Sequence, residues 1–194
     1  MSIKDDMAYL KSIREYIGLS VFLFGLTAVM GYYTAAFDPK FASTWTQELQ
    51  MLKWIMNQPP ILIMIIIFLK NLLASATAML LGLGLGLLPL MVVTSNGFLL
   101  GIVGYGAIQK EGWLYLAAGI LPHGIIELPV VLVSIAIGFR LGHLLILSIL
   151  REKADLSGEI KIAVHFLIRW ITPLLFLAAA IETFITPVVI SVVA

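Results

Sequence analysis

The sequence predicts an all-α protein, a polytopic bundle of about five transmembrane helices, and three observations predict it. Charged residues make up 12% of the 194 residues, hydrophobic residues make up 61%, and the mean hydropathy is +1.06. Soluble domains carry about a quarter charged residues. The charges also leave long uncharged runs, such as 16–37 and 71–109. These runs are continuously apolar rather than alternating, which favours helices and excludes a β-barrel.

The net charge of +1 and the absence of cysteine exclude several classes of function. Nucleic acid is not an expected partner, because no basic patch is left once the lysines and arginines that flank the spans are set aside. A chain without cysteine cannot hold a disulfide, an iron–sulfur cluster or a thiolate zinc site. We therefore predict no cofactor, and we expect the lipid bilayer as the main partner.

The first span is expected at 16–37. The charged residues before it form an amphipathic lead-in that should lie at the membrane surface. Small residues at 34–36 could serve a signal peptidase, but the apolar run is long enough to cross a bilayer and ends in Tyr32 and Tyr33, an interfacial aromatic pair. We therefore predict an uncleaved transmembrane helix.

Residues 38–58 mix charged and aromatic residues at a spacing that suits an interfacial amphipathic helix, which Pro59 and Pro60 then end. The following apolar stretch is too long for one crossing and fits two, at 60–81 and 87–107.

Two positions could hold the turn between the second and third spans. The glycine-rich segment 82–86 is flexible, whereas 89–97 contains more turn-forming residues and would leave one long tilted helix and one short piece.

The fourth span is expected at 113–139, beginning at the interfacial residue Trp113. Pro122 and Pro129 lie inside it, and each removes a backbone hydrogen bond to the carbonyl four residues earlier. We therefore predict a kinked or broken helix near Pro122.

A charged loop at 140–169 and a last span at 170–192 complete the map. Most of the chain's 12 lysines and arginines fall before the first span or in this loop. Cytoplasmic loops carry the excess of positive residues, so we predict a cell-membrane protein with the N-terminus in the cytoplasm and the C-terminus outside. The alternative is that 140–169 faces outward behind a re-entrant segment.

Lys70, Glu127 and Glu182 are charged residues inside predicted spans. A charge at the bilayer centre costs at least about 2.5 to 3.5 kcal/mol, so each should be paired, protonated or facing a wet cavity. One lysine cannot neutralise two carboxylates, and His123 or Asn71 could hold the second. We therefore predict a polar core built from the second, fourth and fifth spans, although Lys70 could also extend to the membrane surface along its apolar stem.

Four glycines predict close helix packing. Gly82 and Gly86, and Gly97 and Gly101, are each four residues apart, a spacing that lets helices approach closely. The same stripes could join two copies of the chain, so we expect a homodimer.

Complete catalytic and metal sites are missing from the pattern. His123 and Glu127 share one helix face but make only half a metal site, and neither His143 nor His165 offers an obvious third ligand. No serine stands in a nucleophile elbow. We therefore predict no metal and no enzyme activity.

Two short elements resemble the stage II sporulation protein M family. They are Pro-His-Gly-Ile-Ile-Glu-Leu-Pro at 122–129 and Ile-Glu-Thr-Phe-Ile-Thr-Pro at 181–187. The resemblance implies a small membrane protein of about five spans. It also implies that the signature positions here are His123, Glu127, Pro129, Glu182 and Pro187, with Asn71 as an addition. In spore-forming bacteria the family member is thought to anchor peptidoglycan-degrading partners, and similar proteins occur in bacteria and archaea that do not sporulate.

The sequence favours a scaffold that recruits membrane or cell-surface proteins through 38–58 and 140–169. A transporter or channel for a small ion or solute, using Glu127 and Glu182 near the membrane midplane, is the alternative. An intramembrane enzyme using His123 as an acid–base residue is a third possibility, and the missing nucleophile argues against it.

Overall fold

A computed structural model describes residues 2–38, 40–41, 57–150, 152 and 154–193. Within these residues every regular element is a helix. Five helical segments are long and apolar enough to cross a bilayer, which confirms the predicted fold class. They are Arg14–Phe37, Pro60–Leu83, Leu87–Glu111, Trp113–Ile149 and Leu156–Val193. Most of the predicted interfacial segment 38–58 lies outside the described residues.

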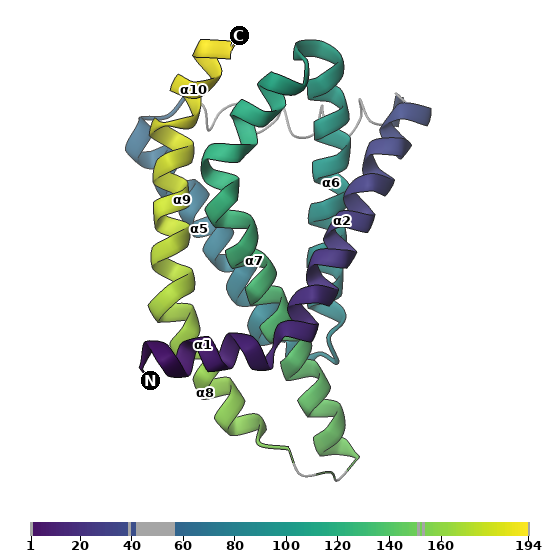
Figure 1. The fold of residues 1–194 in the computed structure, drawn as a ribbon, viewed down its shortest axis with the longest axis vertical. Coiled ribbons are helices and arrows are strands. Elements are labelled where there is room, and N and C mark those ends of the chain that lie inside the picture. Colours follow the sequence, from purple (N-terminus) through teal and green to yellow (C-terminus); the bar gives the residue numbers. More distant parts are fainter. Residues whose placement is uncertain (1, 39, 42–56, 151, 153, 194) are drawn as a thin grey trace.

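The predicted surface lead-in forms helix α1, Ile3–Ser12, which lies across one end of the bundle (Figure 1). Ser2 caps it, because the Ser2 hydroxyl accepts from the Asp5 amide while the Asp5 carboxylate accepts from the Ser2 amide. After Ile13 the chain turns into the first span, α2, Arg14–Phe37. Ile13 is fully buried and so anchors this corner.

Helix α2 packs closely against the third span, α6, Leu87–Glu111, through glycines. A Cβ at Gly97 would meet the Phe24 carbonyl oxygen at 2.5 Å, and one at Gly101 would collide with the backbone of Ala28. The predicted packing glycines of α6 therefore join two helices of one chain, and they do not form the dimer surface that the sequence suggested.

The second span, α5, Pro60–Leu80, leads into a short 3₁₀ turn, η1, Leu81–Leu83. The turn ends at Leu85 and Gly86, which both have positive φ, 58° and 77°. The structure thus places the turn at 82–86, the first of the two predicted positions. A glycine fits the left-handed backbone at 86 without the strain that a side chain adds.

The fourth span, α7, Trp113–Ile149, is one continuous helix of 37 residues that bends along its length (Figure 1). Pro122 and Pro129 lie inside it, so the helix is kinked but not broken. It also runs past the predicted end at 139. The loop prediction is wrong from 140 to 149, because Arg140 finds a partner at 2.6 Å on the next helix and the residues after it are mostly apolar.

Helix α8, Leu156–Phe166, occupies more of the predicted loop, and the chain continues through a π-helical turn, η2, Leu167–Ile171. Helix α9, Thr172–Phe184, and helix α10, Thr186–Val193, complete the last span. Pro187 explains the interruption at 185, because its nitrogen cannot donate to the carbonyl of Thr183.

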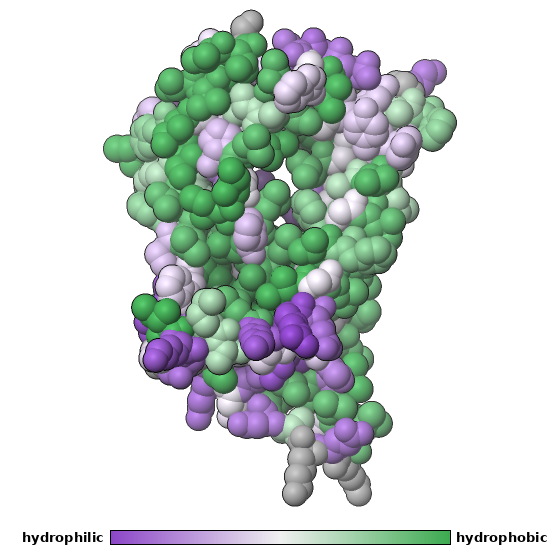
Figure 2. Space-filling view, viewed as in Figure 1, coloured by the Kyte–Doolittle hydropathy of each residue, from purple (hydrophilic) through white to green (hydrophobic). Residues whose placement is uncertain are grey.

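The buried core lies toward the α1 end, where α5, α7 and the last span meet. Its fully buried members include Met79, Ile137, Leu141 and Leu175. The flanks of the bundle are mostly hydrophobic, and hydrophilic residues gather around α1 and at the opposite end (Figure 2). This distribution is the one expected of a bundle surrounded by lipid.

Candidate functional site: an intramembrane polar cavity

A cavity of about 390 Å³ lies between the helices, lined by residues of α2, α5, α6, α7 and α9. Its lining includes polar or charged residues from four of these helices. They are Lys70, Asn71, Asn96, His123, Glu127 and Glu182. All five residues of the predicted polar core therefore lie at one cavity.

His123, Glu127 and Glu182 form the tightest group in the cavity. One ligand atom from each of these side chains lies within 4.8 Å of the other two. His123 and Glu127 lie one turn apart on α7, and Glu182 comes from α9. The packing of the fourth span against the last span thus brings Glu182, which the sequence singled out for the polar core but not as a metal ligand, beside the other two donors.

His123 is oriented by Thr186. The Nδ1 atom of His123 lies 3.4 Å from the Thr186 hydroxyl, and that hydroxyl in turn donates to the Ile181 carbonyl at 3.3 Å. A hydroxyl has one proton to donate, so donation to Ile181 leaves it to accept the Nδ1 proton. Nε2, the other ring nitrogen, makes no hydrogen bond to the described residues.

The two carboxylates have no cationic partner in the part of the chain that the structure describes. The Oε2 atom of Glu127 is buried without a hydrogen bond, and neither glutamate lies within 4.0 Å of the Lys70 ammonium. Lys70 lines the cavity but is itself exposed. Two neighbouring carboxylates repel each other in a low dielectric, so the site favours either a shared proton or a bound cation.

Asn71 and Asn96 contribute amide groups to the lining. Asn96 donates to the Val92 carbonyl of its own helix at 2.8 Å, so part of its hydrogen-bonding capacity is used locally. The sequence pattern does not single out Asn96 as a lining residue, because Asn96 falls within one of the two candidate turns. Its position in the middle of α6 follows from the turn lying at 82–86 instead.

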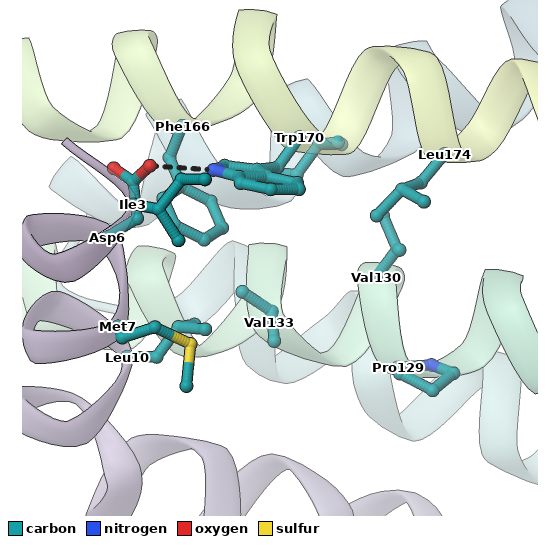
Figure 3. Close-up of a pocket in the computed structure, with 11 residues that line it drawn as sticks. Ile3, Asp6, Met7, Leu10, Pro129, Val130, Val133, Phe166, Trp170 and Leu174 are labelled. Atoms are coloured by element: carbon teal, nitrogen blue, oxygen red, sulfur yellow. Dashed lines mark hydrogen bonds between the residues drawn. The ribbon is translucent and has the colours of Figure 1, made fainter. Parts of the chain in front are cut away.

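A second polar network lies at the α1 end, and the sequence did not predict it. Glu159 accepts a hydrogen bond from the Tyr9 hydroxyl at 2.8 Å and pairs with Arg140 at 2.6 Å. Asp6 accepts from the Trp170 indole at 3.0 Å (Figure 3) and pairs with Arg169 at 3.5 Å. These residues fix α1 and α8 to the transmembrane helices.

Figure 3 also shows an apolar pocket beside this network, about 270 Å³ in volume, where α1 faces α7 and the last span. Its walls are hydrophobic side chains such as Met7, Val133 and Leu174, and Pro129 lies at its edge. Asp6 is its ionisable lining residue, and Trp170 and Arg169 already engage one oxygen of that carboxylate. The pocket therefore offers a ligand fewer charged and polar groups than the polar cavity does.

The other two histidines lie away from the cluster. His143 contacts the Tyr16 hydroxyl at 2.5 Å, and His165 lies on α8. Neither lines the polar cavity. The expectation that they do not complete a site with Glu127 agrees with this placement.

Comparison with known proteins identifies the family. The model of the family "Stage II sporulation protein M" matches residues 20–187. An uncharacterized protein of Methanocaldococcus jannaschii is 31% identical over 109 residues, which is 53% of this chain and 58% of that protein. The chain thus matches somewhat more than half the length of that relative, and no solved structure matches it. With five membrane-length helices and a family match over most of its length, the chain is a multi-pass integral membrane protein that belongs to the stage II sporulation protein M family.

Proposed function

We propose that the protein binds a small cation in the polar cavity and carries it across the membrane. The observation that carries this proposal is the convergence of Glu127, Glu182 and His123 on one cavity within the spans. The sequence alone favoured a scaffold, and transport was its alternative. The cavity is our reason for proposing transport first.

The energetic cost of charges inside the membrane also favours transport over scaffolding. A bundle that only holds partners in place gains nothing from two neighbouring carboxylates that form no salt bridge among the described residues, because each charge at membrane depth is costly. Apolar residues of similar volume would stabilise such a core at least as well. A binding site, in contrast, needs charges that the protein itself does not neutralise.

The bend of α7 supports the same proposal. Pro122 and Pro129 free the backbone carbonyls of Ala118 and Ile125 from their usual helical hydrogen bonds. Irregular helices near the midplane, with free carbonyls and acidic side chains, are how many secondary transporters coordinate cations.

Thiol labelling tests whether the cavity admits water. The native chain has no cysteine, so a single cysteine at 71, 123, 127 or 182 can be labelled with a membrane-impermeant reagent without background. Phe37→Cys and Lys161→Cys are controls at opposite ends of the molecule. We expect labelling at several cavity positions and its reduction by the transported cation. Silence at all four positions, with both controls reacting, would contradict the proposal.

Flux measurements test transport itself. In proteoliposomes, the wild type should carry cations faster than the Glu127→Gln, Glu182→Gln double variant. Equal rates for the two proteins would remove transport as a function.

A scaffold is the second candidate, and one observation favours it. The end of α7 and helix α8 extend beyond α1 (Figure 1). Ile149, the last residue of α7, and Leu150, its C-cap, are each 64% accessible. Exposed apolar residues on an extramembrane projection are typical of surfaces that bind protein partners. A membrane protein that copurifies with the wild type but not with an Ile149→Lys, Leu150→Lys variant would support recruitment.

The homodimer, the cytoplasmic N-terminus and the absence of enzyme activity remain predictions. The glycines first expected to join two copies pack within one chain, so a dimer would need another surface. Native mass measurement in lipid nanodiscs would give the number of copies directly.

A further inference from the structure

We propose that His123, Glu127 and Glu182 bind one divalent transition-metal cation, with Zn²⁺ as the representative ion. This inference rests on the proposed function, because it names the class of cation that the cavity takes. It also reverses the sequence-based expectation of no metal, which depended on the lack of a third ligand.

The donor set is suited to such an ion. It provides one imidazole nitrogen and two carboxylate groups, all within 4.8 Å of one another. Zinc binds these donors at about 2.0 to 2.2 Å, so donors around one ion lie roughly 3 to 3.5 Å apart. Both glutamates have flexible ends, and rotations of their side chains can close this difference.

The imidazole donor favours transition-metal ions over hard cations such as Mg²⁺ and Ca²⁺. Magnesium and calcium prefer sites made of oxygen ligands, whereas an imidazole beside carboxylates suits zinc and its neighbours in the first transition row. The cavity is therefore expected to prefer Zn²⁺ over Mg²⁺.

The Thr186 hydroxyl engages one ring nitrogen of His123 and leaves the other available to a metal ion. The Nδ1 atom of His123 lies 3.4 Å from the Thr186 hydroxyl, and Nε2 makes no hydrogen bond to the described residues. Histidine ligands of metals almost always donate their other ring N–H to an outer partner, which fixes the tautomer and the ring orientation. Thr186 is 5% exposed, so this contact is sheltered from solvent.

Charge and coordination also agree with a divalent ion. Two carboxylates balance its charge, and the buried Glu127 Oε2 gains the partner that it lacks among the described residues. Three protein ligands leave a fourth position open for water or for the Asn71 amide, which lines the same cavity. An ion held by so few protein groups can be released, as transport requires.

Direct binding measurements test the inference. Purified protein in detergent is dialysed against Zn²⁺, the bound metal is counted, and X-ray absorption identifies its ligands. We expect one Zn²⁺ per chain in a shell of nitrogen and oxygen donors that includes imidazole. Glu182→Gln should weaken binding by at least tenfold, whereas Glu111→Gln, which removes an exposed carboxylate elsewhere, should leave it unchanged.

Two more variants separate a binding role from a structural one. Lys70→Met removes a positive charge from the cavity lining and should tighten Zn²⁺ binding severalfold. Thr186→Val removes the outer partner of His123 and should weaken binding about tenfold. If the cluster served packing alone, these two substitutions would not change Zn²⁺ affinity in opposite directions.

The outcomes distinguish this inference from the proposed function. No bound Zn²⁺, a ligand shell without imidazole, or full affinity in Glu182→Gln would overturn the metal site. The proposed function would still stand if the liposomes carried a monovalent cation. Zinc bound as expected without any flux would support the site and contradict transport.

Discussion

The protein contains two clusters of charged residues that differ in how their charges are satisfied. At the α1 end, Glu159 contacts both Tyr9 and Arg140, and its side chain is only 7% exposed. In the cavity, Glu127 and Glu182 lie beside each other without a cationic partner among the described residues. Both carboxylates of the α1 cluster have a cationic partner, whereas the two carboxylates of the cavity form no salt bridge among the described residues.

This difference assigns different roles to the two clusters. A buried ion pair with hydrogen bonds fixes the position of the helices that carry it, and removing one partner is destabilising. Two neighbouring carboxylates raise the energy of the folded state until a proton or a cation joins them. The α1 cluster therefore stabilises the fold, and the charges of the cavity cluster support the proposal that it binds a cation.

The largest expected effect on stability comes from Arg140→Ala. This change leaves the Glu159 carboxylate buried without its cation, which costs about 3 kcal/mol. The melting temperature of the detergent-solubilised protein should fall clearly, and Arg140→Lys should recover part of the loss. An unchanged melting temperature in Arg140→Ala would show that the pair does not hold α8 in place.

Tyr9→Phe should have a smaller effect. It removes a hydrogen bond between a hydroxyl and a carboxylate, worth about 1.5 to 3 kcal/mol for a bond to a charged group. The aromatic ring stays, so its packing against Phe166 is kept. Thermal unfolding near neutral pH measures the difference.

The same variant tests a pH dependence. Burial, and then the negative charge of Glu159, raise the pKa of Tyr9 well above its usual value. Tyrosine in the unfolded chain ionises near pH 10, so the stabilisation is complete below that pH and is lost as the pH rises above it. Wild type should therefore lose more stability than Tyr9→Phe between about pH 9 and 11. If the stability of the two proteins fell by the same amount over this pH range, the result would contradict the buried position of Tyr9.

The smallest effect on stability is expected from Glu182→Gln. The change removes one of two like charges and keeps the size of the side chain, so the melting temperature without added metal should stay within a few degrees or rise. Loss of stability as large as that of Arg140→Ala would mean that the cavity cluster is structural as well, and the comparison would fail.

The cavity cluster could be predicted from the sequence because a charge in an apolar run is visible and energetically costly. Lys70, Glu127 and Glu182 interrupt such runs, and His123 lies one helical turn before Glu127. Their meeting place needed the structure, since Glu182 reaches the cluster only through the packing of α9 beside α7. The sequence therefore placed Glu182 in the polar core without identifying it as a third metal donor.

The α1 cluster could not be predicted because its members have the sequence pattern of ordinary surface residues. Asp6 and Tyr9 belong to a mixed-charge segment, and Glu159 lay in the expected loop. A charged residue such as Arg140 is typical of the boundary of a span, so the sequence predicts that the fourth helix ends at 139. The helix continues for ten more residues, to Ile149.

The most direct test of the central claim compares the Zn²⁺ response of three proteins in thermal unfolding. These are the wild type, the Glu127→Gln, Glu182→Gln double variant and Glu159→Gln. We predict that Zn²⁺ raises the melting temperature of the wild type and has no effect on the double variant. Glu159→Gln should start from a lower melting temperature and still gain the full shift, because ligand binding stabilises any folded state that keeps its site. Equal shifts in the wild type and the double variant would contradict the claim that the open charges of the cavity form the binding site.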